Sequence, residues 1–326
     1  RHQLCVEPEG LDTTEMYVQG MSTSMPIDVQ YAFLRTIPGF EDVKMMRPAY
    51  AIEYDLLDPL QLYPTLEVIK LPGLYSAGQS NGTSGYEEAA AQGLVAGINA
   101  ALKIQGKDPF ILARHEAYIG SLVDDLVTKG ADEPYRMMTS RSEYRLILRQ
   151  DNADLRLTEK GHSIGLVGEE RYARFLERKK KYEEAMDYIR TQRFTPKEEI
   201  NRALESMGTA PLTTGTGADQ ILKRPEMTYR KMMEILGCPS FDEEAVEEME
   251  ITVKYEGYIA RQEAAVRKAA RMENEKLPPD MDYLSLDGIS TEARQKMDKI
   301  RPLSLGQAAR IPGVSPADIS VLMVEQ

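Results

Sequence analysis

The most constraining feature of this sequence is a run of glycines that leads directly into a helix rich in alanine and glycine, "LYSAGQSNGTSGYEEAAAQGLVAGINAAL" at residues 74–102. The apolar residues at its start are typical of the end of a buried strand. The glycines that follow permit backbone turns that residues with a Cβ resist: Gly78, Gly82 and Gly85. The pattern predicts a strand that passes through a tight turn into a helix.

The start of this helix could hold a ligand. A helix N-terminus presents unpaired N–H groups and a partial positive charge, and glycines before it let an anion or a cofactor ring approach the backbone. Ser84 and Glu87 match a capping box, and small residues at every fourth position predict close packing on a sheet: Ala89, Gly93 and Gly97. Helices of this kind also occur in α/β proteins without a ligand, and Glu87 and Glu88 could simply offset the helix dipole. Spacing alone leaves both interpretations open.

Composition limits the class of protein. The chain has 326 residues, 42% of them hydrophobic, which is enough for two or three domains with cores of their own. It has 52 acidic against 40 basic residues and a net charge of -12, so it is not a protein that coats nucleic acid indiscriminately. Any nucleic-acid site is therefore expected to be a local patch.

The sequence predicts a cytoplasmic protein. It has no apolar run of about 18 residues and no signal-peptide pattern in "RHQLCVEPEG". Cys5 and Cys238 are far apart and have no CxxC spacing, which favours a reducing compartment and excludes a zinc-site pattern. Because the chain begins without methionine and directly with strand-like residues, we expect an amino-terminally truncated protein.

Strand and helix patterns divide the chain into three predicted domains. Residues 1–107 have α/β character, with strands in "HQLCVE", "EMYVQG" and "YAIEYDLL" and a helix in "PIDVQYAFLRTI". The remainder is predicted to be mainly helical, as a subdomain over 108–215 and a carboxyl-terminal domain over 216–326. The loop "GTAPLTTGTGADQ", residues 208–220, is rich in Gly, Thr and Pro and is predicted to join the two helical parts.

Helix signals in the second half are specific enough to test. Capping boxes are predicted at Ser140 to Glu143, Thr195 to Glu198 with Pro196 at the first helical position, and Ser240 to Glu243. The longest helix is predicted over 242–276. Its apolar stripe comprises Val246, Met249, Val253, Ala260 and Ala264.

Arginines gather in "EPYRMMTSRSEYRLILRQDNADLRL". If a helix begins at Ser140, the spacing of four places three guanidinium groups on one face: Arg141, Arg145 and Arg149. Arg136 and Arg156 extend this basic patch, and Tyr135 and Tyr144 could stack on bases; such groups suit phosphate and exposed bases. The alternative is a solvated face with salt bridges to Glu143, Asp151 and Asp154, which the sequence alone favours.

Several long, irregular strings resemble the MnmG (GidA) family of tRNA uridine 5-carboxymethylaminomethyl modification enzymes over nearly the whole chain. They are "AGQSNGTSGYEEAAAQGLVAGINAA", "RPAYAIEYD", "EPYRMMTSRSEYRLILRQDNADLRLTEKG", "LKRPEMTY" and "VKYEGYIARQ". The resemblance implies an α+β or α/β fold class, with the remnant of a glutathione-reductase-like FAD-binding domain followed by a mainly helical carboxyl-terminal region. It also implies FAD, NADH as reductant, a methylene-tetrahydrofolate carbon, and modification of the wobble uridine of certain tRNAs.

The resemblance also assigns residues and partners. Gln79 would meet the flavin, and the start of the helix would be lined by Asn81, Gly82, Thr83, Gly85 and Tyr86. The arginine stretch would bind tRNA through Arg136, Arg141, Arg145 and Arg149, above all Arg136 and Arg145. An MnmE-type GTPase would contact the carboxyl-terminal domain, and a homodimer is expected. Catalytic residues are not assigned, and no metal site is expected.

Some parts of the family pattern are absent. The GxGxxG fingerprint that would cradle the FAD pyrophosphate does not occur, nor does the segment with a reactive cysteine. We therefore expect the chain by itself to hold FAD weakly and to be inactive, and Cys5 to be a buried apolar residue. His2, His115 and His162 are scattered and are expected to be surface or satisfied core residues.

The carboxyl-terminal "SLGQAARIPGVSPADISVLMVEQ" predicts two helices joined by a turn at Pro312 to Pro316. It has only Arg310 as a base for gripping phosphate. Its apolar residues, Ile311, Val314, Ile319, Leu322 and Met323, suit either a protein contact or a terminal core hairpin. The functional alternative to a tRNA-modifying enzyme is a non-catalytic helical adaptor that binds proteins.

Overall fold

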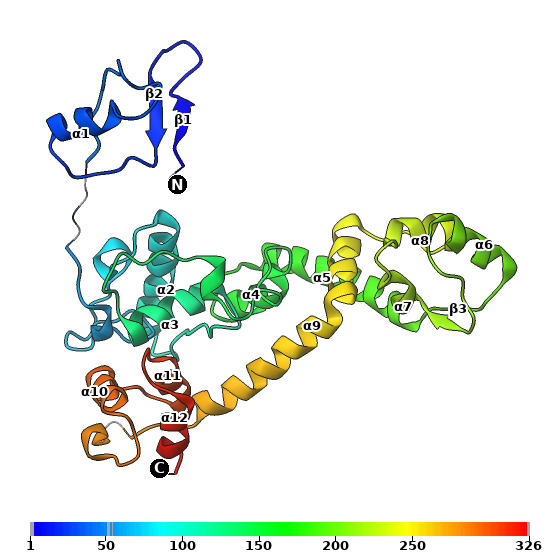
Figure 1. The fold of residues 1–326 in the computed structure, drawn as a ribbon. Coiled ribbons are helices and arrows are strands. Elements are labelled where there is room, and N and C mark those ends of the chain that lie inside the picture. Colours follow the sequence, from blue (N-terminus) through cyan, green and yellow to red (C-terminus); the bar gives the residue numbers. More distant parts are fainter. Residues whose placement is uncertain (1–2, 51–52, 54, 279, 325–326) are drawn as a thin grey trace. The chain divides into compact units, whose positions relative to one another are not determined.

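The computed structural model describes residues 3–50, 53, 55–278 and 280–324. The chain forms two compact units, residues 1–55 and 56–326, which are described separately. The helices of the second unit, which carry most of the predicted site residues, are labelled in Figure 1.

The first unit contains a two-stranded antiparallel sheet and one helix. Strands β1 (Cys5–Pro8) and β2 (Met16–Gln19) pair with Val6 opposite Val18, and α1 (Ile27–Leu34) follows. The predicted strands and helix are thus confirmed. Cys5, predicted to be buried, is exposed, as are all four residues of β1. Of the third predicted strand, residues 51–52 and 54 lie outside the described residues, as does His2. The described residues of that segment, 50, 53 and 55–57, form no strand, so this prediction was wrong for them.

The second unit is mainly helical, as the sequence predicted. Strands β3 (Arg193–Phe194) and β4 (Thr216–Gly217), of two residues each, pair antiparallel in this unit. Its helices are, in chain order, α2 (Tyr86–Ile104), α3 (Tyr118–Lys129), α4 (Ala153–Ser163), α5 (Glu169–Thr191), α6 (Glu198–Ser206), α7 (Ala218–Leu222), α8 (Tyr229–Leu236), α9 (Glu243–Asn274), α10 (Thr291–Ile300), α11 (Leu305–Arg310) and α12 (Pro316–Leu322).

The segment before α2 is not a strand, contrary to the prediction. Leu74 is exposed, and Tyr75 makes only an isolated bridge to Glu67. Residues Gly78–Asn81 form a 3₁₀ turn, which ends at Gly82 in the left-handed region with φ of 83°. The carbonyl of Leu74 accepts from the N–H of Val68, and the N–H of Ser76 donates to the carbonyl of Leu66, so the segment bonds to the neighbouring loop without forming a strand. Helix α2 begins at Tyr86, as the sequence predicted.

Helix α2 buries a face other than the predicted one. Val95 and Ala96 pack in the core against α3 and the loop at residues 62–68, and Leu102 is also buried. Gly93 and Gly97 are exposed, and a Cβ on either would meet nothing within 4 Å. No sheet among the described residues packs on the stripe formed by Ala89, Gly93 and Gly97. The prediction that these small residues lie close to a sheet was therefore wrong for this unit.

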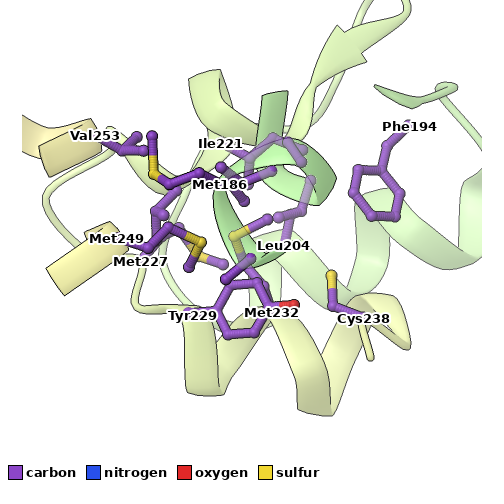
Figure 2. Packing of buried hydrophobic residues seen from close by; sticks show 14 of the residues in the cluster. Met186, Phe194, Leu204, Ile221, Met227, Tyr229, Met232, Cys238, Met249 and Val253 are labelled. Carbon is purple, nitrogen blue, oxygen red and sulfur yellow. The ribbon is translucent and has the colours of Figure 1, made fainter. Parts of the chain in front are cut away.

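The largest core combines α5 to α8 with the first part of α9 (Figure 2). It is rich in methionine: Met186, Met227, Met232 and Met249 belong to it, together with the buried Tyr229. Unbranched methionine side chains fill the irregular gaps between short helices. Leu204 and Leu212 share this core with Ala218 and Ile221, so the loop at 208–220 lies within one core and does not join two.

Two predicted capping boxes in this region are wrong. Helix α6 begins after Lys197 with no side-chain cap, and α9 is capped by Asp242, whose carboxylate accepts from the N–H of Ala245 at 3.4 Å. The carboxylate of Asp242 lies at the N-cap position itself, which leaves Ser240 no role there. Pro196 likewise precedes the helix instead of opening it.

Helix α9 spans 32 residues, which is roughly 48 Å at 1.5 Å per residue, and the predicted long helix is confirmed. Its first part packs on α5, and its last turn reaches the terminal bundle of α10 to α12 (Figure 1). The predicted apolar stripe holds only for the first part: Met249 and Val253 are buried, whereas Ala260 and Ala264 are exposed between the two cores.

The predicted terminal pair of helices is confirmed as α11 and α12. Ile311, Ile319 and Leu322 are buried in the bundle core, and a capping box at Ser315 and Asp318 opens α12. This supports the core-hairpin interpretation of these residues; Met323 alone among the five is half exposed. No helix among the described residues is long and apolar enough to cross a membrane.

Candidate functional site

The turn before α2 is held by a buried network of neutral side chains. The Asn81 amide donates to the carbonyl of Ser76 at 2.9 Å and to Gln92 Oε1 at 2.8 Å, and it accepts from the Ser76 hydroxyl at 2.6 Å. The Thr83 hydroxyl donates to the carbonyl of Gly78 at 3.1 Å and accepts from Gln92 Nε2 at 3.0 Å. The side chains of Asn81 and Thr83 therefore stabilise the turn and do not point out of it.

The N-terminus of α2 has no side-chain cap. The N-cap is Gly85, and Ser84, predicted to cap, donates its hydroxyl to the carbonyl of Tyr135 instead. The backbone of Ser84 also donates to that carbonyl at 3.0 Å, and the N–H of Tyr135 donates to the carbonyl of Gly82 at 2.8 Å. The turn is thereby joined to the start of the arginine stretch, and the first N–H groups of α2 stay uncapped.

Only some of the residues predicted at this turn expose side chains. Gln79 is exposed and Tyr86 is 82% exposed, whereas Asn81, Gly82, Thr83 and Gly85 are buried. A ligand at this entrance would meet the main chain of residues 82–86 together with Gln79 and Tyr86.

The arginine stretch is not a helix. Residues Thr139–Arg141 form one 3₁₀ turn, and residues 142–149 follow an irregular path of bends and turns. The N–H of Leu146, which a helix would give to the carbonyl of Ser142, donates to Gln262 Oε1 on α9 at 3.2 Å. The Ser142 hydroxyl accepts the N–H of Tyr144 at 3.2 Å, which competes with the helix. The predicted capping box at Ser140 and the shared helix face of the arginines were therefore wrong.

Arg114, which the sequence analysis missed, is central to this segment. Its buried guanidinium donates to Asp125 at 2.8 Å, Asp124 at 3.0 Å and Glu143 at 2.8 Å, and also to the carbonyl of Arg141 at 3.2 Å. Burial alone would lower the pKa of Arg114, but the hydrogen bond to Glu143 and the charges of the two aspartates raise it above its ordinary value. We call this set of contacts the Arg114 network.

Tyr135 connects the Arg114 network to the predicted RNA-contacting residues. Its hydroxyl donates to Asp125 Oδ2 at 2.8 Å, and the guanidinium of Arg141 lies 4.4 Å from its ring centroid. Burial, followed by the charge of Asp125, raises the pKa of Tyr135, which keeps the hydroxyl protonated as a donor. The exposed Arg141 is thus held by a cation–π contact.

The four predicted arginines have different environments. Arg145 is exposed, and no hydrogen bond or ion pair joins it to another described residue. Arg136 is 47% exposed and lies 3.6 Å from Glu87 and 3.7 Å from Glu88. Arg149 is mostly buried and is bound by Asp151 at 3.0 Å and Glu248 at 2.6 Å. For Arg149 the salt-bridge interpretation is therefore confirmed, and Asp151 is one of the partners that the sequence predicted.

Glu248 is a second residue that the sequence analysis missed. It is buried; one oxygen accepts from Arg149, whereas Oε2 has no hydrogen-bond partner. Burial, followed by the neighbouring Asp151, raises the pKa of Glu248 to about 7. Its position among the buried Ala245, Met249 and Val253 of α9 was a usable signal, because a charged residue on a buried helix face requires a partner.

Arg310 does not offer a free base at the terminal turn. Its guanidinium is bound to Asp124 of α3 and to Glu273 of α9, with the Asp124 contacts at 2.7 and 2.8 Å. Arg310, the base predicted for gripping phosphate in this segment, is therefore already occupied by carboxylates. Through Asp124, this arginine instead ties the terminal bundle to the Arg114 network.

The remaining candidates are structural. His162 stacks on Tyr172 with ring centroids 3.8 Å apart, and His115 meets Tyr144 edge-on. Cys238 is buried, and burial raises the pKa of its thiol, which disfavours a nucleophile. Among the described residues no group of three or more His, Cys, Asp or Glu could hold a metal ion.

Comparison with known proteins defines the class to which this fold and site belong. Residues 1–108 match the family "Glucose inhibited division protein A". Residues 169–263 match the "tRNA modifying enzyme MnmG/GidA C-terminal helical domain", and residues 265–325 match the corresponding C-terminal helical bundle.

Individual relatives agree. The chain is 57% identical over 324 residues to the tRNA uridine 5-carboxymethylaminomethyl modification enzyme MnmG of Clostridium kluyveri, and 55% identical over 325 residues to that of Caldicellulosiruptor saccharolyticus. Each alignment covers 99% of this chain and 52% of the relative. The structure of Aquifex aeolicus GidA in its form II crystal matches with a TM-score of 0.80 at 45% identity, over 99% of this chain and 52% of that one.

The chain belongs to the MnmG (GidA) family, as the resemblance predicted. It spans about half the length of the curated relatives it matches.

Proposed function

We propose that this chain contributes the tRNA-binding segment and part of the flavin site of an enzyme that modifies C5 of the wobble uridine of tRNA. The relatives named above are tRNA uridine 5-carboxymethylaminomethyl modification enzymes. The observation that carries the proposal is Arg145, which is exposed and has no hydrogen bond or ion pair to another described residue. It lies on a segment whose backbone is bound by the buried Arg114 and the half-buried Gln262.

The exposed arginines suit an RNA loop. A guanidinium group binds phosphate with two parallel hydrogen bonds and stacks on unpaired bases. Arg145, Arg141 and Arg136 are the residues that we propose to contact tRNA, whereas Arg149 supports the segment through Asp151 and Glu248. A local patch of this kind is compatible with the acidic composition of the whole chain.

The entrance of α2 fits one end of a flavin dinucleotide. Gly82 has φ of 83°, Gly85 is buried, and the first turn of α2 has no side-chain cap, so main-chain N–H groups are available for a polar ring edge. We propose that the backbone of residues 82–86 with Gln79 and Tyr86 would hold this end of FAD, while Asn81 and Thr83 keep the turn in shape. When bound, the flavin supplies redox chemistry, with NADH as the proposed reductant.

The chain alone is proposed to be inactive and to hold FAD weakly, because it lacks a GxGxxG fingerprint. An absorbance spectrum of the purified chain with stoichiometric flavin would refute this part. An MnmE-type GTPase and a second copy of the chain are the proposed protein partners, and the half-exposed Met323 at the end of α12 is available for such a contact.

The test is the affinity for an unmodified tRNA transcript measured at several salt concentrations. Arg145→Ala is expected to weaken tRNA binding by about tenfold. It should also reduce the slope of log affinity against log salt concentration by the equivalent of about one phosphate contact. Arg136→Ala is expected to cause a smaller loss of affinity. The matched control is Arg174→Ala, since Arg174 is exposed on α5 and its ion pair is with Glu170 of its own helix.

Equal affinity of Arg145→Ala and Arg174→Ala would remove the tRNA assignment. Absence of any tRNA binding together with binding of a GTPase partner would favour the alternative, a non-catalytic helical adaptor.

A further inference from the structure

A cavity of about 330 Å³ lies beside the first turn of α2 and the start of α3. Part of its wall is apolar, formed by Ala91, Ile119, Leu122 and Met137 together with the ring of Tyr118. The charged part consists of Glu87, Glu88 and Arg136. An apolar cavity with a few convergent polar groups is the usual form of a small-ligand site.

Glu88 has an unsatisfied oxygen. The side chain is only 4% exposed, and its Oε1 accepts the N–H of Met137 at 2.7 Å, whereas Oε2 has no hydrogen-bond partner. Leaving a buried acceptor unpaired is costly, and native structures contain few such groups. Glu88 is therefore an acceptor that is placed and oriented but lacks a donor.

Arg136 does not satisfy Glu88. Its guanidinium lies 3.7 Å from Glu88 and 3.6 Å from Glu87, both beyond hydrogen-bond length, and nearly half of its side chain is exposed. A loosely held, exposed arginine can rotate at little cost and carries several N–H donors. Arg136 can thus move aside and bind a carbonyl oxygen next to Glu88.

Gly85 keeps the space between these groups open. A Cβ at this position would overlap both Glu88 Oε2 and Arg136 Nη1. The absence of a side chain at Gly85 therefore allows the two charged groups to approach each other. Its backbone conformation does not require glycine, because its φ of -108° is in the ordinary extended region.

We propose that this cavity binds an imide edge, an N–H group beside a carbonyl, of the kind that a uracil ring presents. The N–H would donate to Glu88 Oε2, a carbonyl oxygen would accept from Arg136, and the ring would lie against Ile119, Leu122 and Met137. The proposal rests on the proposed function, since uridine is the target base named for the relatives. The isoalloxazine ring of a flavin has the same edge, and the experiment separates these two sources.

The test follows the methyl NMR signals of Ile119 and Met137 in the 326-residue chain during titration with uridine and, separately, with riboflavin. Uridine, riboflavin or both are expected to shift these signals. The 3-methyl derivative of the compound that binds has no imide N–H and is expected to leave the signals unchanged. A shift by uridine assigns the cavity to the RNA base, and a shift by riboflavin assigns it to the flavin. No shift by either compound, or equal shifts by the 3-methyl derivatives, would overturn the proposal.

Two variants test the role of Glu88. Glu88→Gln retains an oxygen for the N–H of Met137 but places an amide donor where Oε2 lies, and it is expected to weaken binding at least about tenfold. The control Glu170→Gln, which changes an exposed glutamate on α5 that does not line the cavity, is expected to change binding less than about twofold. If Glu88→Gln does not fold, Arg136→Met leaves the Glu88 bond to Met137 intact and is expected to weaken binding as well. Unchanged binding in the folded variant would contradict the assignment.

Failure of this inference and failure of the proposed function are distinguishable. Glu88-dependent binding of uridine with tRNA affinity that is insensitive to Arg145→Ala would leave the cavity standing and refute the tRNA segment. If Arg145→Ala weakens tRNA binding but no ligand binding depends on Glu88, the tRNA assignment is supported and the proposed ligand site in the cavity is refuted.

Discussion

The turn before α2 and the arginine stretch are adjacent in the structure but are stabilised in different ways. The turn is held by neutral groups close in sequence: Ser76, Asn81, Thr83 and Gln92 all lie within 17 residues of one another. The arginine stretch is held by charged and amide side chains from distant helices, such as Gln262, which is 116 residues from Leu146. The conformation of the turn is therefore stabilised mainly by neighbouring residues, with backbone bonds to Tyr135 as its distant contacts, whereas that of the arginine stretch depends on the assembled fold.

This difference explains which predictions succeeded. The glycines before α2 correctly marked a turn into a helix, because left-handed backbone at Gly82 is a local requirement. The spacing of Arg141, Arg145 and Arg149 matched a helix, but Glu143 binds Arg114 and the N–H of Leu146 binds α9, so tertiary contacts override the local pattern. No local signal could have revealed Arg114, whereas Glu248 on a buried helix face could have been found.

The largest expected effect follows from removing the centre of the Arg114 network. Arg114→Met is expected to lower the free energy of unfolding by about 3–5 kcal/mol, because Asp124, Asp125 and Glu143 lose a shared buried cation. Urea denaturation measures the loss. The exposed Arg174→Met serves as control, with a change expected below about 0.5 kcal/mol. A similarly small change for Arg114→Met would show that the segment does not depend on the network.

The local turn is tested by two glycines with nearly equal φ. Gly82→Ala combines a left-handed backbone at 83° with a Cβ only 2.7 Å from that of Ala131, and a loss of about 2–3 kcal/mol is expected. Gly165→Ala has φ of 81° with nothing within 4 Å, so it should cost about 1–2 kcal/mol from backbone strain alone. Equal losses in the two variants would mean that the turn is not tightly packed against Ala131.

Glu248 gives the charged region a pH dependence that the neutral turn lacks. Because its pKa in the folded protein is raised to about 7, the folded state binds an extra proton between about pH 4.5 and 7, and this stabilisation is lost as the pH rises through that range. Glu248→Gln mimics the protonated form. The free energy of unfolding of Glu248→Gln, measured relative to that of the parent chain, should therefore increase between pH 5 and pH 8 by an amount on the order of 1–2 kcal/mol.

The control for this measurement is Glu244→Gln, since Glu244 is exposed at the start of the same helix. A difference between parent and Glu248→Gln that is constant with pH would contradict the raised pKa.

The central claim is that side chains from distant helices, and not the local sequence, fix the backbone that presents Arg145. The most direct test is native-state hydrogen exchange at the amide of Leu146 in the parent chain and in Gln262→Ala. We predict that Leu146 exchanges about tenfold faster in the variant, while Leu148, whose N–H donates locally to the carbonyl of Tyr144 at 2.9 Å, and Val95 within α2 are unchanged. An unchanged exchange rate at Leu146 would contradict the account.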